Sequence, residues 1–325
     1  MRSVLVTGGT GSFGQAFVRR ALELGAERVV VFSRDEAKQD AMRWAFKDDS
    51  RLRWAIGDVR DVERLKTAMT KKAKKKTKPV DVVIHAAAMK QVEACQYNPF
   101  EAKKTNVDGA ENVINAALAV GVPKVMALST DKAVDAVNTY GKTKSLAEDM
   151  FVDANNYSGA DGTRFACVRY GNVLSSRGSV LPVWIAASER GEPLRITDPS
   201  MTRFVITLPQ AVDFVLGALA DMKGGEVFVP RLPALDLVTM AQAVTWPRPP
   251  ELDCVGVRPG EKKHELLIST NEAHRTRDEG DRFVVYRWLG KGGGEGEFSS
   301  ASAEQLGVDA FRRLAGLGGV EEVAA

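Results

Sequence analysis

The sequence has little of what builds disulfide scaffolds, metal centres or membrane spans. It contains only three cysteines and three histidines in 325 residues. The cysteines, Cys95, Cys167 and Cys254, stand singly, without the spacing of a disulfide framework or a metal site. No stretch approaches the roughly 20 consecutive apolar residues that a transmembrane helix needs. We therefore expect no disulfide scaffold, no metal and no membrane span.

The chain also lacks a strong overall charge. Its 45 Lys and Arg residues nearly balance 42 Asp and Glu residues, for a formal net charge of +3. The excess is local, because the segment 71–78 alone carries six lysines. We interpret this segment as a solvated, mobile insertion, with binding to nucleic acid or to an anionic membrane as alternatives. No aromatic residues are interleaved to stack bases, so we expect no nucleic-acid partner.

The overall composition is that of a globular protein with one large domain or two smaller ones. Hydrophobic residues make up 44% and charged residues 27% of the chain. The printed sequence begins with Met1 and runs directly into an apolar segment, so we expect no signal peptide. We accordingly expect a cytoplasmic protein whose cysteines are reduced.

Short continuous apolar runs alternate with helical periodicity over the first half of the chain. This alternation predicts βαβ units, and the unbroken apolar runs predict strands that are buried on both faces. The fold class is therefore α/β, a Rossmann-like doubly wound parallel sheet. The predicted strands are Ser3–Thr7, Arg28–Phe32, Leu52–Ile56, Val80–His85, Lys124–Leu128 and Phe165–Arg169. The predicted helices are Phe13–Leu24, Arg60–Met69, Phe100–Val120, Thr139–Asn156 and Gln210–Met222.

After residue 171 the alternation loosens and prolines recur at short intervals. We assign 1–171 to a dinucleotide-binding domain, joined by a returning segment near 207–230. A smaller, irregular α/β substrate-binding lobe comprises 172–206 and 231–289. The rest, 290–325, is predicted to be a flexible glycine-rich loop around Leu289–Phe298 and a C-terminal helix.

A glycine-rich turn follows the first predicted strand. Gly8, Gly11 and Gly14 recur at three-residue spacing just before a helix. Glycines there permit a sharp turn and a close approach to a pyrophosphate, which the amides of the helix N-terminus can bind. The sequence therefore predicts a dinucleotide site on this turn, which also includes Thr10, Ser12 and Phe13.

The residues after the second strand indicate which dinucleotide fits. An acidic residue there holds the ribose of NAD, whereas arginine suits the 2′-phosphate of NADP. Ser33 and Arg34 come first and favour NADP, although Asp35 keeps NAD as an alternative. Asp58, followed by Val59, either receives the adenine amino group or caps the next helix.

Tyr140 and Lys144 are four residues apart on a predicted helix and so share one face. A nearby ammonium stabilises a phenolate and lowers its pKa. Such a tyrosine can act as a general base on a substrate alcohol.

Together these motifs resemble the extended short-chain dehydrogenases/reductases that act on nucleotide sugars, over roughly residues 1–285. The resemblance rests on the glycines, Asp58-Val59, the run His85-Ala86-Ala87-Ala88, Asn106 and the Tyr140/Lys144 pair. It implies that Thr130 is the hydroxyl partner of Tyr140. It also implies that Ala86, Ala87 and Ala88 adjoin the cofactor and that Asn106 is a structural or cofactor-side residue.

Asp131-Lys132, directly after Thr130, narrows the resemblance. A 4-epimerase needs no acid/base pair here, whereas a 4,6-dehydratase does. The pair resembles that of the configuration-inverting UDP-N-acetylglucosamine 4,6-dehydratases of pseudaminic acid-type pathways. Further matching segments are 89–93, 169–173, 176–180, 201–204 and 258–262. One departure from the group is Asp135-Ala136, where Asn-Pro is expected.

This resemblance implies a hydro-lyase with a bound, recycled NADP and a UDP-sugar substrate. Lys132 would be the base at C5 and Asp131 the acid at C6, unless the two form only an exposed ion pair. The predicted substrate-binding residues, of which the arginines would face the diphosphate, are Lys90, Asn172, Arg177, Ser179, Arg203, Arg258 and Glu261. Lys90 is equally interpretable as a surface lysine. Relatives assemble into dimers or hexamers, so a homo-oligomer is expected.

Three rival functions remain open at this stage. The first is a UDP-sugar 4-epimerase of the same fold, which would keep the C6 hydroxyl. The second is a non-catalytic NADP-binding regulator, against which the Tyr140/Lys144 pair argues. The third is a membrane scaffold that docks through the lysine-rich segment 71–78.

Overall fold

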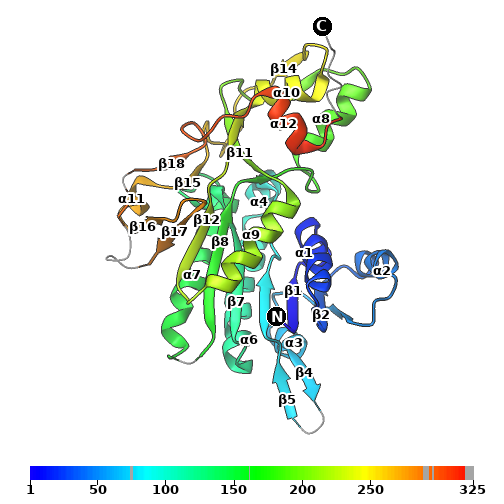
Figure 1. The fold of residues 1–325 in the computed structure, drawn as a ribbon, viewed down its shortest axis with the longest axis vertical. Helices are drawn as coiled ribbons and strands as arrows, with labels where there is room; N and C mark the ends of the chain where they lie inside the picture. The colour runs from blue at the N-terminus through cyan, green and yellow to red at the C-terminus, as the bar shows by residue number, and fades with distance from the viewer. Residues whose placement is uncertain (74–75, 161, 288–292, 295, 319–325) are drawn as a thin grey trace.

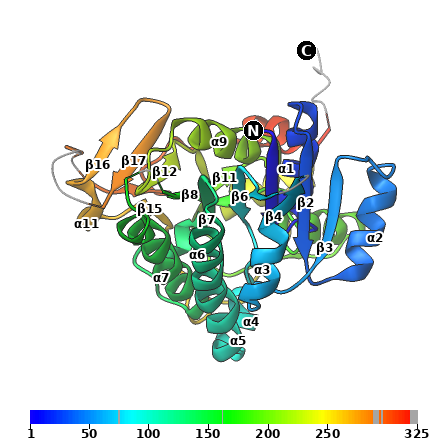
Figure 2. The same cartoon turned by 90° about the horizontal axis from the view of Figure 1, so that it is seen from below.

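Seven parallel strands form the centre of the molecule, in the order that a doubly wound fold requires. The computed structural model describes residues 1–73, 76–160, 162–287, 293–294 and 296–318. Across the sheet the order is β3-β2-β1-β6-β7-β8-β12 (Figures 1 and 2). The strands are β1 (Ser3–Thr7), β2 (Arg28–Ser33), β3 (Leu52–Ile56), β6 (Val82–His85), β7 (Lys124–Thr130), β8 (Arg164–Tyr170) and β12 (Glu226–Pro230). The order changes direction between β1 and β6, which is where ligands bind in such sheets.

Helices cover both faces of this sheet (Figure 2). α1 (Ser12–Glu23) packs beside α9 (Leu208–Asp221) on one face. α3 (Val62–Met69), α6 (Gly109–Val120) and α7 (Thr139–Asp153) pack in a row on the other. Except for the edge strand β3, the strands between the two layers are almost wholly buried, in agreement with their continuous apolar sequences.

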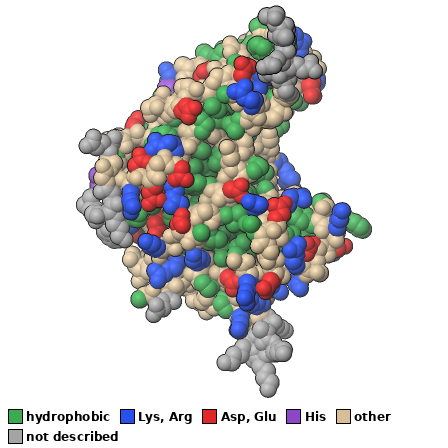
Figure 3. Space-filling view, viewed as in Figure 1, with side chains coloured by type: hydrophobic (Ala, Val, Ile, Leu, Met, Phe, Trp, Pro, Cys, Tyr) green, Lys and Arg blue, Asp and Glu red, His purple; other side chains and the backbone are tan. Residues whose placement is uncertain are grey.

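A second lobe lies above the carboxyl ends of the central strands (Figure 1). Its core contains Trp184, Met240 and Phe311. Its strands are β9 (Asn172–Val173), β10 (Leu194–Ile196), β11 (Thr202–Ile206), β13 (Ala234–Asp236), β14 (Leu252–Cys254), β15 (Leu266–Ile268) and β18 (Phe298–Ser299). Its helices are α8 (Val180–Glu189), α10 (Leu237–Thr245), α11 (Thr270–Ala273) and α12 (Val308–Ala315). Figure 3 shows the surface hollowed between this lobe and the first.

Two strands within the range 231–289, which was assigned to the second lobe, extend the central sheet instead. β17 (Arg282–Tyr286) pairs antiparallel with β12, and β16 (Thr276–Asp278) pairs antiparallel with β17. The predicted returning segment is present as α9 and β12, and the predicted C-terminal helix as α12. Of the predicted glycine-rich loop, 288–292 and 295 lie outside the described residues.

The described part of the lysine-rich segment contains two paired strands, which its composition did not indicate. β4 (Thr70–Ala73) and β5 (Lys76–Pro79) pair as an antiparallel hairpin that projects from the amino ends of the central strands (Figure 1). Residues 74–75, in the middle of this predicted insertion, lie outside the described part of the chain. No helix in the described residues is long and apolar enough to cross a bilayer.

The predicted helix Phe100–Val120 forms in three consecutive pieces. α5 (Pro99–Lys103) leads into a π-helical turn at Lys104–Asp108, which leads into α6. Such π turns often lie at functional sites. Here the turn carries Asn106. The short helix α4 (Val92–Tyr97) precedes this run, and α2 (Glu36–Ala45) follows β2.

Candidate active site

The glycine-rich turn between β1 and α1 leaves backbone exposed where a dinucleotide phosphate would approach. Gly8 has a φ of 64°, and a Cβ there would lie 2.9 Å from Ala86 O. A Cβ on Gly14 would lie 2.5 Å from Gly8 O. No side chain caps the N-terminus of α1 at Gly11, so its first amides face outward without a side-chain acceptor. These features fit a bound pyrophosphate.

Three other predicted cofactor residues, Thr10, Phe13 and Val59, have the following contacts. Thr10 Oγ lies 2.8 Å from Ser33 Oγ, at the end of β2. Phe13 stacks on Phe17 within α1, with ring centroids 5.9 Å apart. The buried Val59 packs against Gly109, where a Cβ would lie 2.7 Å from the valine Cγ2.

Asn106 holds the segment that follows β6. Its amide group pairs with both backbone groups of Met89, accepting from N at 2.8 Å and donating to O at 3.0 Å. It also donates to Thr143 Oγ, at 3.0 Å, on α7. Asn106 thus ties the chain next to Lys90 to the helix that carries Tyr140.

The acidic residues after β2 and β3, Asp35 and Asp58, already have hydrogen-bond and ion-pair partners within the protein. Asp35 caps α2, where its carboxylate accepts from Lys38 N at 3.0 Å and pairs with the Lys38 ammonium. Asp58 accepts from Arg60 N at 3.0 Å and pairs with the Arg60 guanidinium at 2.8 Å. The alternative that Asp58 caps the next helix is wrong, because Asp61 is the N-cap of α3. Arg34 lies 3.6 Å from Asp58 and is 61% exposed.

Asp131 and Lys132 form a 3₁₀ turn directly after β7, packed against the start of α7. Gly141 permits this approach, because a Cβ there would lie only 2.1 Å from Lys132 O. The Asp131 side chain is 1% exposed and that of Lys132 is 21% exposed. The alternative of an exposed surface pair is therefore wrong.

Lys132 has an oxygen acceptor for each N–H bond of an ammonium group. Its Nζ lies 3.1 Å from Asp131 Oδ1, 3.2 Å from Asn172 Oδ1 and 3.1 Å from Glu265 Oε1. Although burial opposes the charge, the two carboxylates raise the pKa of Lys132 above its ordinary value. Burial, together with Glu265, raises the pKa of Asp131. In the structure Lys132 is therefore a cation.

Tyr140 faces this cluster. Burial raises its pKa to about 12, and the largest opposing influences are the charge of Lys132 and a hydrogen bond with Thr130. Thr130 also donates to Asp131 Oδ1, at 2.9 Å. Lys144 Nζ instead donates to Leu128 O at 2.6 Å, and burial lowers the pKa of Lys144. The cation that acts most strongly on Tyr140 is thus Lys132, whereas the sequence predicted Lys144.

Two predicted substrate residues lie close to the glycine-rich turn. Arg177 N donates to Ser12 Oγ, at 3.1 Å, at the start of α1. Desolvation and the positive charge of Arg177 lower the pKa of Lys90. A Cβ on Gly178 would lie 2.4 Å from Gln91 Nε2, so this segment lies directly over the chain after β6. Ser179 is the N-cap of α8, and its buried Oγ has no hydrogen-bond partner among the described residues.

The other predicted substrate residues have partners within the protein. Arg258 pairs with Glu93 at 2.9 Å, and Glu261 closes the same turn by accepting from Arg258 N at 3.3 Å. Arg203 is buried and donates to the carbonyl oxygens of Thr202 and Lys263 at 2.8 and 3.1 Å. Its role as a diphosphate ligand stays a prediction.

Two charged residues of the site were missed by the sequence analysis, Glu265 and Lys262. Glu265 precedes β15 and contacts Lys132 from the second lobe. Lys262 donates to Val134 O, beside the 3₁₀ turn. Both belong to or closely follow the matching segment 258–262, which was the one available signal. No group of His, Cys, Asp and Glu in the described chain could hold a metal ion.

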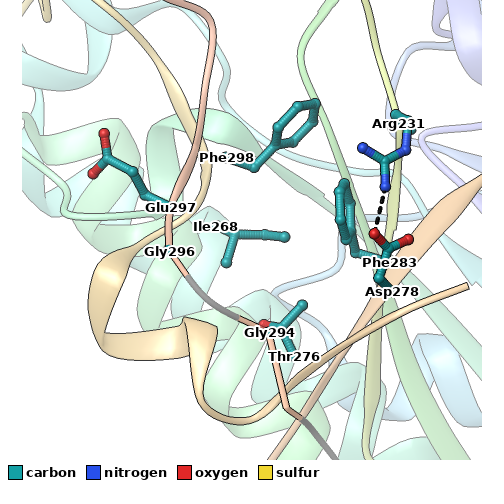
Figure 4. Close-up of a pocket in the computed structure, with 9 residues that line it drawn as sticks. All are labelled: Arg231, Ile268, Thr276, Asp278, Phe283, Gly294, Gly296, Glu297 and Phe298. Atoms are coloured by element: carbon teal, nitrogen blue, oxygen red, sulfur yellow. Dashed lines mark hydrogen bonds and ion pairs between the residues drawn. The ribbon is translucent and has the colours of Figure 1, made fainter. Parts of the chain in front are cut away.

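A separate pocket lies between the edge strands β16 and β17 of the central sheet and the β15–β18 pair, and contains none of the predicted site residues (Figure 4). Arg231 closes one side of it through an ion pair with Asp278 at 2.7 Å, and stacks over the Phe283 ring. Arg231 and Asp278 are thus paired with each other, and we assign the pocket no chemistry.

Comparison with known proteins agrees with this architecture. A family profile described as "Polysaccharide biosynthesis protein" matches residues 4–287. The chain is 46% identical over 279 residues to a Campylobacter jejuni "UDP-N-acetylglucosamine 4,6-dehydratase (inverting)", covering 85% of this chain and 80% of that protein. It is also 40% identical over 290 residues to a Rickettsia canadensis "UDP-glucose 4-epimerase", covering 87% and 82%.

Solved structures show the same fold. The X-ray structure of Pen from Bacillus thuringiensis is 34% identical, covers 98% of both chains and superimposes with a TM-score of 0.89. DesIV from Streptomyces venezuelae, a dTDP-glucose 4,6-dehydratase solved with NAD, is 21% identical over 80% of this chain and 86% of that chain, with a TM-score of 0.71. By sequence and fold, this chain belongs to the polysaccharide biosynthesis protein family, within the extended short-chain dehydrogenases/reductases.

Proposed function

We propose that the protein is a UDP-N-acetylglucosamine 4,6-dehydratase that inverts C5, a hydro-lyase whose products are UDP-2-acetamido-2,6-dideoxy-4-keto-hexose and water. The buried Asp131–Lys132 pair beside Tyr140 carries this proposal. The name of the Campylobacter relative supports the same substrate and the same stereochemical outcome.

The glycine-rich turn would hold the dinucleotide pyrophosphate, and we propose NADP in preference to NAD. The carboxylate of Asp35 is occupied at the N-cap of α2, so it is poorly placed to accept from a ribose 2′-hydroxyl. Arg34 is exposed beside Ser33, where a 2′-phosphate would need a guanidinium. Bound on this turn, the cofactor would supply reversible hydride transfer between C4 and C6 of the sugar, without net redox chemistry.

Tyr140 is the group proposed to take the proton of the C4 hydroxyl. Its pKa of about 12 makes it a strong base once ionised, and the neighbouring Lys132 cation favours that ionisation. Thr130 shares a hydrogen bond with Tyr140 and can receive or pass on the proton. Lys144, whose Nζ donates to Leu128 O, adds a second amine on the face of α7 that carries Tyr140.

Asp131 and Lys132 are proposed to remove water across C5 and C6. A ketone at C4 acidifies the C5 proton, because the carbanion formed is an enolate. Lys132 takes this proton after passing its own ammonium proton to a neighbouring carboxylate. Asp131, whose pKa is raised by burial, donates a proton to the leaving C6 oxygen. A proton then reaches C5 from the opposite face, which gives inversion.

The diphosphate of the substrate requires positive charge and free donors near this cluster. Arg177 and Lys90 together supply charge at the edge between the lobes. The unpartnered Ser179 hydroxyl at the N-terminus of α8 supplies a donor. We propose these three as diphosphate ligands, with Arg258 and Glu261 bordering them.

A UDP-sugar 4-epimerase is the second candidate, favoured by the name of the Rickettsia relatives at 40–41% identity. An epimerase moves hydride at C4 only and needs no acid/base pair at C5 and C6. The buried Asp131–Lys132 pair has no task in that reaction, so we rank it second. A homo-oligomeric assembly and a cytoplasmic location stay predictions from the sequence.

Product mass separates the two candidates. Purified protein is incubated with UDP-N-acetylglucosamine and NADP, and the product is analysed by mass spectrometry while NADPH absorbance is followed. Dehydration predicts a product lighter by one water, without accumulation of NADPH. A product of unchanged mass, with the sugar epimerised, would establish the epimerase instead.

A further inference from the structure

Lys132 is held from both lobes at once. Asp131 belongs to the 3₁₀ turn after β7, in the first lobe, whereas Glu265 precedes β15, in the second. Asp131 Oδ1 and Glu265 Oε1 each lie 3.1 Å from Lys132 Nζ. The acid/base pair is therefore the centre of a carboxylate–ammonium–carboxylate triad.

We propose, building on the dehydratase function above, that Glu265 is a positioning residue that holds the Lys132 ammonium and sets the charge balance of the Asp131–Lys132 pair. The first argument is rigidity. Glu265 N donates to Ser300 Oγ at 2.9 Å, and Ser300 N donates to Glu265 O at 2.9 Å. Ser300 Oγ is itself 2.7 Å from Thr202 Oγ. These bonds fix the backbone of Glu265, so its buried side chain starts from a fixed point beside Lys132.

The second argument is unused acceptor capacity. Glu265 Oε2 and Asp131 Oδ2 are both buried and have no hydrogen-bond partner in the part of the chain that the structure describes. Buried carboxylate oxygens are normally satisfied, since an unpaired one costs free energy. A free oxygen on either side of Lys132 can accept the proton that the lysine must release to act as a base. The N–H bond of Lys132 breaks, an O–H bond forms on the carboxylate, and no further reactant is needed.

The charges around Glu265 favour its ionised form. Although burial opposes it, the cations Lys132, Arg203 and Lys262 lower the pKa of Glu265. Lys262 also faces Asp131 and Asp135, and Tyr140 faces Lys132 from α7. Because the pKa of Glu265 is lowered and that of Asp131 is raised, Asp131 is the better acceptor of the proton that Lys132 releases.

Removing the charge of Glu265 should lower the pKa values of both Asp131 and Lys132. Glu265 contributes a negative charge beside both Asp131 and Lys132, and a negative neighbour raises the pKa of any acid. Glu265→Gln removes that charge, so the pKa values of both groups fall. Both limbs of the pH profile of kcat therefore move to lower pH, whichever of the two groups is the acid and whichever the base. A charge at this distance shifts a pKa by about 1–3 units.

The experiment compares pH profiles of dehydration for the wild type, Glu265→Gln, Glu265→Asp and the control Glu226→Gln. Glu226 is a buried carboxylate at the opposite, amino edge of the sheet, where it accepts from Lys223 N and Gly224 N. We expect both limbs of Glu265→Gln to shift by at least about 1 pH unit. Glu265→Asp, which keeps the charge, should retain the wild-type limbs with a lower kcat, and the control should retain both limbs and kcat.

A stability measurement keeps the test valid if Glu265→Gln folds poorly. Lys132→Met leaves two buried carboxylates without their cation. If Glu265 is the counter-ion of Lys132, adding Glu265→Gln to Lys132→Met raises the melting temperature.

The outcomes separate this inference from the proposed function. A wild type that does not dehydrate UDP-N-acetylglucosamine refutes the function, while the stability test of the triad still applies. A wild type that dehydrates, with Glu265→Gln slower but with unshifted limbs, reduces Glu265 to a packing residue and overturns the inference. A double variant less stable than Lys132→Met overturns it as well.

Discussion

Replacing Gly141 by alanine should push α7, which carries Tyr140, away from the 3₁₀ turn that carries Asp131 and Lys132. A Cβ at this position would lie 2.1 Å from Lys132 O and 3.1 Å from Ala136 Cβ. Carbon and oxygen atoms in close contact need roughly 3.3 Å. The start of α7 and the Asp131–Lys132 turn must therefore move apart by about 1 Å.

Such a displacement has a large expected effect on rate and a smaller one on stability. A misplacement of about 1 Å can reduce a rate by about 100-fold, because the reacting groups leave their productive geometry. The overpacking costs about 1–3 kcal/mol of stability, which the better helix propensity of alanine offsets by up to ~1 kcal/mol. Gly141→Ala should thus fold, bind NADP and lose about two orders of magnitude in kcat.

Gly217→Ala is the matched control. Gly217 lies inside α9, and a Cβ there meets nothing within 4 Å. Alanine should raise the free energy of unfolding by about 1 kcal/mol without altering kcat. The assay is initial-rate dehydration together with urea unfolding of both variants. A wild-type kcat for Gly141→Ala would refute the close approach on which the site depends.

Three further predictions test the fold and the cofactor. Arg169 pairs with Glu148 and Glu272 in the interior, so Arg169→Met leaves two buried carboxylates without their cation. The free energy of unfolding, measured with urea at neutral pH, should fall by about 3–5 kcal/mol. A fall of less than about 1 kcal/mol would contradict the paired geometry. Burial lowers the pKa of His85 to about 3, so below pH ~6.5 the unfolded chain binds a proton that the folded chain does not, and stability falls as the pH falls. Between pH 7 and pH 5 this loss is about 2 kcal/mol, and His85→Asn should remove it; equal pH dependence in the wild type and the variant would count against the prediction. Arg34→Glu should weaken NADP binding by about 10–100-fold in calorimetry, because a charge-assisted hydrogen bond is lost, and leave NAD binding much less affected; equal losses for both cofactors would argue against a 2′-phosphate contact.

The central sheet was predictable because burial on both faces requires continuous apolar strands. β1 and β3 were predicted to the residue, and β2, β7 and β8 to within two residues at either end. α2 was missed because its surface is mostly exposed, with only Gln39 and Met42 buried, so its sequence has no marked apolar face. The lysine-rich hairpin was missed because its repeated charges gave no sign of strand pairing.

The residues of the site that lie in local sequence motifs were predictable, whereas contacts between residues far apart in the sequence were not. The glycine turn was indicated by its spacing, and the consecutive residues Thr130, Asp131 and Lys132 by the resemblance to a known family. Glu265 reaches Lys132 only after the chain has passed through the second lobe. No spacing rule predicts a contact of that kind. The stronger influence of Lys132 on Tyr140 likewise follows from how Gly141 lets α7 pack on the turn.

The account rests on proton removal at C5 by the Lys132 side of the triad, and solvent exchange measures that step directly. UDP-N-acetylglucosamine is incubated with the enzyme and NADP in deuterated water, and the product is examined by NMR. The account predicts a new C6 methyl group with one deuterium at C5, and Lys132→Ala should bind NADP normally but incorporate none. A product that keeps its C6 hydroxyl and its original C5 proton, or a Lys132→Ala variant that exchanges C5 at the wild-type rate, would contradict it.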